Sequence, residues 1–407
     1  MLIFKLAWRN IWRNKRRTII TTLSIIVAVF LSAITRSTQE GQYDNMLDNT
    51  VGSFSGYIQV HQDGYQDNPT LDNSFQMSDS LLKSIASQPA VSAVVPRIDS
   101  YALAATEAQS RPVMIMGIDI EAEQQLSKPV ENLETGRYFE TNNEQAAIIG
   151  SDLLIRLNAR IGDSLVVIGQ GYHGMNATGL YRIKGTVRYP NPEMNKSLVY
   201  LPLETAQYLF SAEKRLTSLA LNINDPDDLN RTVEALKENL SGKNYEVLGW
   251  PELMPELKQA IQVDRGSGVI IILILYMIVG FGVLGTVLMM IAERYYEFGV
   301  MLSVGTPRTT IAKILSLEVV ILSLMGTILG ILLSIPVAWY FNVHPIDLSG
   351  AMASAAEQYN MSPMLQFSVA PDIFTNQALI VFIITLIFSV YPILKASQLN
   401  PVKAMKS

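Results

Sequence analysis

The chain has 407 residues, of which 49% are hydrophobic, a formal net charge of −5 and no cysteine. This length exceeds one compact core, and the lack of cysteine excludes disulfides and cysteine-ligated metal sites. Four stretches contain no Asp, Glu, Lys or Arg and reach or nearly reach the roughly 20 residues that cross a bilayer core. This pattern predicts a membrane protein and excludes most classes of soluble enzyme.

Residues 1–17 are expected to form an amphipathic helix on the membrane surface. Apolar residues recur there at helical spacing beside a row of cations, namely Phe4, Trp8, Ile11 and Trp12 beside Lys5, Arg9, Arg13 and Arg16. Tryptophan and cationic side chains both suit the headgroup level of a cytoplasmic interface. A basic flank of the first span without this role is the alternative.

One predicted span precedes a long polar insert and three follow it. The spans cover residues 18–36, 266–292, 311–343 and 373–394, with the insert at 37–265, a short segment at 293–310, a loop at 344–372 and a tail at 395–407. We expect the first span to be a retained anchor, because the residues after it make a poor signal-peptide cleavage site. Basic residues without acids precede the first span and follow the last one. The positive-inside rule therefore places both termini and the short segment in the cytoplasm, and the insert outside.

The insert is predicted to be an α+β domain with its own core, carried on stalk helices that continue the first and second spans. Extended segments are expected at residues 90–105, 112–119 and 146–150, and the glycine-rich residues 169–179 are expected to form a flexible loop. Residues 36–265 hold 30 acidic and 19 basic residues. This acidic balance argues against a nucleic-acid partner.

Glycines in the second and third spans are expected to allow close helix packing. Gly280, Gly282 and Gly285 formally satisfy the G-x-G-x-x-G pattern of dinucleotide sites, but the required strand and βαβ unit are missing. Gly326 and Gly330 form a G-x-x-x-G pair with the same interpretation. The sequence leaves open whether the partner helix belongs to this chain or to another.

No residues support a catalytic or metal site. The three histidines lack metal-ligand spacing, no carboxylate pair stands out, and no P-loop motif occurs. We therefore expect no catalytic residue, metal or cofactor in this chain. Glu318 is the ionisable residue nearest to the membrane interior, where a functional role is one hypothesis. An interfacial pair with Lys313 or Arg308, or a simple position at the end of the span, is the favoured interpretation.

The segment 293–310 is predicted to contain a short amphipathic helix that projects into the cytoplasm. Phe298, Met301, Leu302 and Gly305 fall on one helical face, and this glycine with the following proline ends the helix. A helix that lies flat on the bilayer is the alternative.

Several motifs follow one another along the chain. They are Leu6–Arg17 before the first span, Glu293-Arg294 through Glu297-x-Gly299 to Ser303-Val-Gly305 after the second, Leu317-Glu318 with Gly326 and Gly330 in the third, Tyr391-Pro392 through Asn400-Pro401 to Ala404 at the C-terminus, and Gly56–His61 and Ile148–Gly150 through Leu157 to Gly162-Asp163 in the insert. In this order they resemble the FtsX-type permeases of ABC transporters, which include MacB-like exporters and the LolC/LolE lipoprotein-releasing subunits. The first insert motif is most similar to LolC/LolE.

The resemblance implies a four-span α-helical protein of the bacterial inner membrane with an α+β, MacB-like periplasmic core domain. It also implies a second permease, identical or homologous, and a cytoplasmic ATPase dimer that binds ATP and Mg²⁺. The residues expected to contact the ATPase are motif glutamates and glycines together with the apolar face of the short helix: Glu293, Glu297, Phe298, Gly299, Met301, Leu302 and Gly305.

The expected function is that of a non-catalytic permease subunit that converts ATP hydrolysis into work in the periplasm. Release of lipoproteins is the first choice, with lipoprotein or lipid-like cargo and a periplasmic adaptor or chaperone as a further partner. A MacB-like export permease is the alternative of the same class. A membrane-anchored binding or signalling protein without an ATPase is the alternative of another class.

Overall fold

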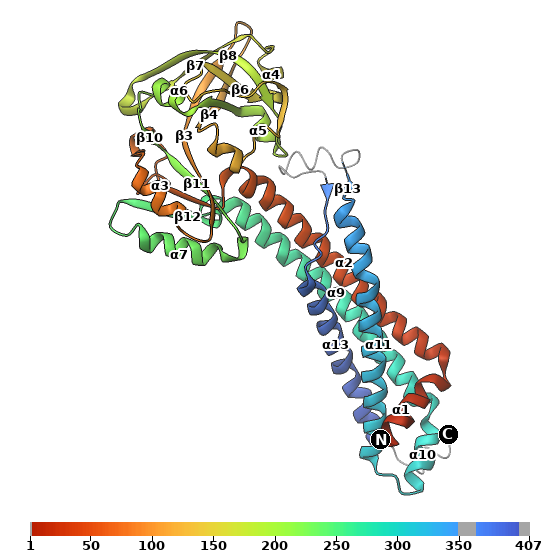
Figure 1. Cartoon of the computed structure of the whole chain (residues 1–407). Coiled ribbons are helices and arrows are strands. Elements are labelled where there is room, and N and C mark those ends of the chain that lie inside the picture. Colours follow the sequence, from red (N-terminus) through yellow and green to blue (C-terminus); the bar gives the residue numbers. More distant parts are fainter. Residues whose placement is uncertain (1, 349–363, 399–407) are drawn as a thin grey trace. The chain divides into compact units, whose positions relative to one another are not determined.

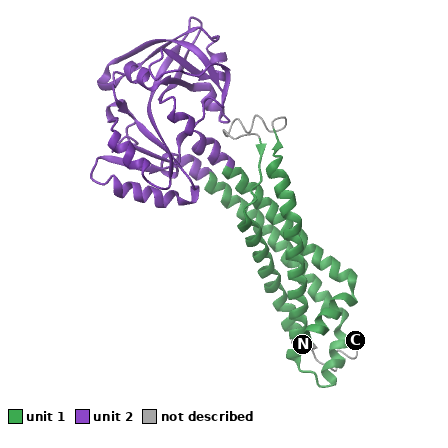
Figure 2. Ribbon diagram, in the orientation of Figure 1, with its two compact units in different colours: residues 1–44, 261–348, 364–407 green, residues 45–260, 349–363 purple. Residues whose placement is uncertain are grey.

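The computed structural model describes residues 2–348 and 364–398 and consists of two compact units (Figures 1 and 2). Residues 45–260 form an α/β unit, which we call the sheet domain. The other described residues form a mainly helical unit, which we call the span unit. The C-terminal motif at residues 400–404 and most of the predicted loop at 344–372 lie outside the described residues.

Four helices are long and apolar enough to cross a membrane. They are α2 (Lys15–Leu47), α9 (Pro255–Glu293), α11 (Arg308–Val343) and α13 (Pro371–Ser397), which run side by side in the span unit (Figure 1). Two short helices, α1 (Leu2–Arg13) and α10 (Tyr295–Ser303), lie at one end of this bundle, which we call the base. Each predicted span falls on one of the four long helices, and α2 and α9 extend beyond the predicted spans.

The small residues of α11 set how closely it approaches α2. A Cβ atom added at Gly326 would lie 2.6 Å from the side chain of Ile25, and one at Gly330 would lie 2.7 Å from Val29. No larger residue fits there without a shift of one helix. The G-x-x-x-G pair therefore packs against a helix of its own chain, which answers the question that the sequence left open.

The three glycines of α9 lie on different sides of that helix. A Cβ at Gly280 would approach the Phe388 ring of α13 to 2.6 Å, whereas one at Gly282 or Gly285 would meet no described atom within 4 Å. Residues two and five positions apart point in different directions on a helix of 3.6 residues per turn. The packing prediction is therefore not supported within the described chain for these last two glycines.

The sheet domain is built on a 10-stranded sheet in the order β12-β1-β11-β3-β4-β9-β6-β8-β5, with β7 pairing β3 and β8. The strands are β1 (Ile58–Gln62), β3 (Val91–Ala105), β4 (Ser110–Ile118), β5 (Leu133–Gly136), β6 (Ala146–Gly150), β7 (Ser164–Gln170), β8 (Asn176–Val187), β9 (Leu198–Pro202), β11 (Ser218–Ile223) and β12 (Tyr245–Gly249). The helices around them are α3 (Asp79–Ala86), α4 (Ser151–Arg156), α5 (Pro192–Ser197), α6 (Leu203–Leu209), α7 (Leu229–Asn239) and α8 (Trp250–Leu253). Two small ribbons complete the elements, β2 (Phe75–Gln76) with β10 (Arg215–Leu216) in this domain, and β13 (Ile346–Asp347) with β14 (Met364–Leu365) in the span unit.

The long strand β3 connects the two ends of the sheet. Its first half pairs with β11, and its second half pairs with β4 and β7. The predicted extended segments at 90–105, 112–119 and 146–150 lie on β3, β4 and β6. Parallel pairs occur between β4 and β9 and between β6 and β8, among otherwise antiparallel neighbours. The mixed sheet with helices around it agrees with the predicted α+β domain.

The prediction of a flexible loop at residues 169–179 is wrong. β7 and β8 form an antiparallel hairpin that reaches from Ser164 paired with Arg182 to Gln170 paired with Asn176. Only residues 171–175 connect the two strands, and His173 adopts a left-handed conformation with φ of 52°. Glycine content suggested freedom of the backbone, but the cross-strand hydrogen bonds restrict it.

The two kinds of span glycine give a matched pair of substitutions. We expect Gly326→Leu to destabilise the full chain in detergent by about 1–3 kcal/mol, because overpacking pushes α11 away from α2. The measurement is the thermal unfolding midpoint, which should fall. Gly285→Leu adds the same side chain where nothing lies within 4 Å and should leave the midpoint unchanged. Equal effects of the two substitutions would contradict the packing described here.

Candidate functional site

The base of the span unit is the candidate site, and its central element is the short helix α10. The helix begins after Arg294, where the backbone leaves the path of α9. It ends in a Schellman motif, in which the amide of Gly305 donates to the Leu302 carbonyl and the amide of Thr306 donates to the Met301 carbonyl. Gly305 has a φ of 98°, a conformation that favours glycine. Sequence and backbone geometry therefore agree on a separate helix between α9 and α11.

One face of α10 is packed against the span helices. Phe298 is 1% exposed and Gly299 is also buried, and Met301 and Leu302 pack against the same cluster of apolar side chains. The guanidinium of Arg294 lies 4.9 Å from the centre of the Phe298 ring. The face that the sequence predicted to bind a partner is thus largely used to hold the helix in place.

The opposite face of α10 is apolar and exposed. Tyr296, Val300 and Val304 are 59%, 39% and 82% exposed, and their spacing of four residues places them on one side of the helix. We call these three residues the docking face. Helical periodicity identified an apolar face of this helix but not which of its two apolar faces the bundle covers, and contact of the predicted residues with an ATPase stays a prediction.

A buried ion pair joins the start of α10 to α11. Nη1 of Arg294 donates to both carboxylate oxygens of Glu318, at 2.8 and 3.1 Å, and Nδ2 of Asn10 donates to Oε1 at 2.6 Å. The side chains of Arg294 and Glu318 are 8% and 1% exposed. The prediction that Glu318 pairs with Lys313 or Arg308 is therefore wrong, since the cation comes from before α10.

A second set of ion pairs surrounds the buried one. Nη2 of Arg13 donates to both oxygens of Glu297 at 2.7 and 2.8 Å, and Nε of Arg294 donates to the same carboxylate at 3.2 Å. Glu293 accepts from Arg17 at 3.0 Å and from Asn14 at 3.1 Å. The two motif glutamates thus bind the N-terminal segment of this chain, which sequence reasoning did not foresee.

The charges of the outer pair reinforce one another. Partial burial of Glu297 acts to raise the pKa of its carboxyl, but the hydrogen bonds from Arg13 and Arg294 outweigh this and hold that pKa below its ordinary value. The hydrogen bond to Glu297 raises the pKa of the Arg13 guanidinium. Both groups are therefore charged at neutral pH, so the base is tied together by complete ion pairs.

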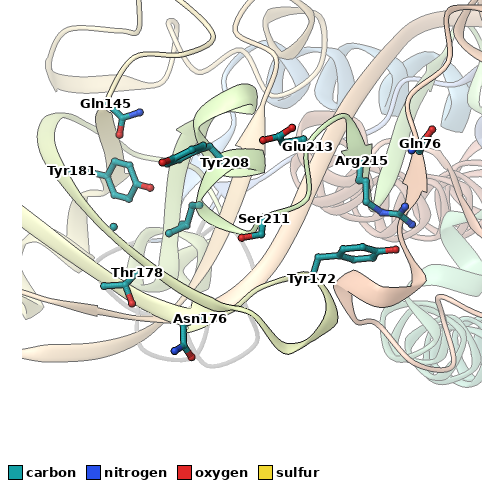
Figure 3. Close-up of a pocket in the computed structure, with 12 residues that line it drawn as sticks. Gln76, Gln145, Tyr172, Asn176, Thr178, Tyr181, Tyr208, Ser211, Glu213 and Arg215 are labelled. Atoms are coloured by element: carbon teal, nitrogen blue, oxygen red, sulfur yellow. The ribbon is translucent and has the colours of Figure 1, made fainter.

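The sheet domain offers a separate, polar groove of about 720 Å³. Its lining includes Tyr172, Tyr181, Tyr208 and Arg215 (Figure 3). The Arg215 guanidinium stacks 4.3 Å above the Tyr172 ring, and its Nε donates to the Ser74 hydroxyl at 2.7 Å. Arg215 thus ties Tyr172 to the segment around Ser74 within the sheet domain. Across the described residues, no group of three His, Asp or Glu side chains could hold a metal ion.

The buried pair can be tested by removing one partner and then both. We expect Glu318→Gln to destabilise the chain by roughly 3–5 kcal/mol, because the Arg294 guanidinium then stays buried without its main counter-charge. Replacing both residues by methionine should recover most of that loss, since two apolar side chains of similar size need no partner. The measurement is thermal unfolding of the full chain in detergent, and a double variant as unstable as the sum of the singles would contradict the pairing.

Comparisons with known proteins agree with this architecture. Residues 18–239 match the family described as the MacB-like periplasmic core domain, and residues 269–401 match the FtsX-like permease C-terminal family. Among relatives, the lipoprotein-releasing system transmembrane protein LolC of Neisseria meningitidis is 20% identical over 84% of this chain and 83% of its own length. The macrolide export ATP-binding/permease protein MacB of Acinetobacter baylyi is 22% identical over 99% of this chain, which spans only 59% of that relative.

A solved structure of the periplasmic region of MacB from Actinobacillus actinomycetemcomitans shares 16% identity, with a TM-score of 0.35 over 50% of this chain and 92% of that one. The family matches cover both the sheet domain and the spans that follow it. The chain therefore belongs to the FtsX-type permeases of ABC transporters, the superfamily that contains MacB and LolC.

Proposed function

We propose that this chain is the transmembrane subunit of an ABC transporter in the inner membrane of a bacterium with two membranes. In this proposal the base of the span unit lies in the cytoplasm and the sheet domain lies in the periplasm. The basic N-terminal segment supports that orientation, because all six of its charged residues are cations: Lys5, Arg9, Arg13, Lys15, Arg16 and Arg17.

The observation that carries the proposal is the pairing of an anchored face and a free face on α10. The buried face is locked to the span helices, while the docking face presents three apolar side chains at the base. A partner that binds the docking face moves α10, and α10 cannot move without α11 and the N-terminal segment. We propose that the partner is a cytoplasmic ATPase dimer, which binds ATP and Mg²⁺.

The transmission of this movement follows the ion pairs. Arg294 links α10 to Glu318 on α11, and Glu293 links the end of α9 to Arg17 at the start of α2. α2 and α9 are the two helices whose chain continues into the sheet domain. ATP-driven movement of α10 is thereby passed to the two helices that lead to the periplasmic domain, in a complex with a second, identical or homologous permease.

We propose lipoprotein as the cargo, with a periplasmic adaptor or chaperone as its acceptor. The span unit contains a pocket of about 420 Å³ among α2, α9 and α13, lined mainly by apolar side chains such as Val269, Leu273, Leu379 and Ile380. Such a surface suits acyl chains better than a hydrophilic solute. Export of an apolar small molecule is the second candidate, since the name of the MacB relative gives macrolide export for that protein and the same pocket suits an apolar solute.

The docking face gives the first test of this proposal. We expect Val300→Glu with Val304→Glu to abolish co-purification of the ATPase, because two carboxylates replace the exposed apolar contact. Val130→Glu with Ile155→Glu adds the same charges at positions of the sheet domain that are 50% and 73% exposed, and should leave the complex intact. Retention of the ATPase by the first variant at wild-type level would show that α10 does not bind it through this face.

Cargo release gives the second test. The chain is reconstituted in proteoliposomes that contain a diacylated or triacylated lipoprotein, together with the ATPase encoded by a neighbouring gene and any second permease encoded there. We expect ATP-dependent transfer of the lipoprotein to an added periplasmic acceptor, and a stimulation of ATP hydrolysis by the lipoprotein that an unacylated version does not give. Stimulation only by apolar drugs would favour the export permease, and an absence of any associated ATPase would favour the binding or signalling protein.

A further inference from the structure

Helix α1 has two faces with different partners. Ala7 and Ile11 are buried against the span helices, and α1 packs along α11. From the same helix Asn10 donates to Glu318 and Arg13 to Glu297. One face of α1 therefore helps to fix the position of α10.

The other face carries exposed aromatic side chains. Phe4, Trp8 and Trp12 are 55%, 43% and 46% exposed, and they recur every four residues along one side of α1. The two indole rings meet edge to face at 6.0 Å. Large aromatic groups exposed in a row at the end of a membrane bundle suit burial at the level of lipid headgroups.

The cations beside these rings divide into two groups. Arg13 and Arg17 have carboxylate partners in this chain, as described above. Lys5 and Arg9 on α1 and Lys15 and Arg16 at the start of α2 are exposed, and the described residues provide no carboxylate within ion-pair distance of them. Four unpaired cations next to three exposed aromatic rings are complementary to a surface that is anionic and apolar at once, which is the headgroup region of an acidic phospholipid layer.

We infer that α1 is a receptor for the anionic phospholipids of the leaflet that it faces, and that this lipid surface keeps α1 in the position that locks α10. The aromatic part of the lipid contact and the α10 contact lie on opposite faces of α1, a twelve-residue helix. Loss of the lipid contact therefore loosens Asn10 and Arg13 from their carboxylates. The consequence for ATP hydrolysis rests on the proposed function, whereas the lipid contact does not.

The lipid contact is tested with the tryptophans of α1 as reporters. The full chain, with Trp250→Phe and Trp339→Phe to remove the other two indoles, is placed in nanodiscs that contain brominated phosphatidylglycerol or brominated phosphatidylcholine. We expect stronger quenching by the brominated phosphatidylglycerol, and each neutralised cation should weaken that preference by about fivefold in affinity. Equal quenching by the two lipids would overturn the inference.

The variant and its control differ only in where the charge is removed. Lys5→Gln, Arg9→Gln, Lys15→Gln and Arg16→Gln together should abolish the preference. The control replaces four exposed cations of the sheet domain by glutamine, Lys83, Arg156, Arg231 and Lys243, and should keep the preference. If both variants kept the preference, these four cations would not be the receptor.

The effect on coupling is measured in the same nanodiscs with the ATPase bound. We expect cargo-stimulated ATP hydrolysis to fall severalfold in pure phosphatidylcholine and in the α1 variant, and to remain in the control. If the rate of ATP hydrolysis changed neither with the lipid nor with the α1 variant, the inferred effect on coupling would be overturned, even if the quenching were selective for phosphatidylglycerol. Loss of ATPase binding by the α1 variant in detergent would show that these cations bind the ATPase instead of lipid. Failure of any ATPase to bind the wild type would refute the proposed function and leave the quenching result standing.

Discussion

The buried ion pair between Arg294 and Glu318 is the constraint on which the base of the span unit depends. Removing two charges from water is costly, and the pair is stable only because its geometry is good and the remaining lone pairs are satisfied. Here both carboxylate oxygens accept from the guanidinium, and Asn10 supplies a third hydrogen bond. Any movement that separates α10 from α11 exposes two opposite charges to a poorly solvated environment, so the two helices move together.

The outer ion pairs contribute much less to stability than the buried pair. Arg13 and Glu297 are 55% and 43% exposed, and exposed pairs contribute about 0–1 kcal/mol. They are too weak to hold α10 by themselves, but they fix where α1 lies once the buried pair has set the position of α10. The buried pair therefore accounts for most of the attachment of α10 to the span helices, and the exposed pairs add to it.

The sequence was sufficient to predict the architecture but not the contacts between residues within the site. Uncharged length predicts the four spans because hydrocarbon thickness sets a minimum, and aromatic spacing predicts α1. Periodicity places Phe298 and Met301 on one face of α10, yet it contains no information on whether that face meets lipid, a partner or the bundle. The partner of Glu318 was missed for the same reason, because Arg294 is brought close by a reversal of chain direction that no local pattern encodes. Two neighbouring signals, a cation just after one span and an acid just inside the next, could have suggested the pair.

The distribution of charge also limits what the span unit can carry. Within the segments predicted as spans, the only acidic side chain is Glu318, and it is paired with Arg294 at the base. A hydrophilic solute needs a hydrated or charged path through the bilayer, and charged residues within spans are where such paths are found. In the proposed function, work at the docking face is instead delivered as movement of α2 and α9. An acyl chain needs no such path, because it is already dissolved in the membrane and has only to leave it. The same ion pair that stiffens the base therefore favours a mechanical subunit acting on cargo from the lipid phase over a channel for cargo from water.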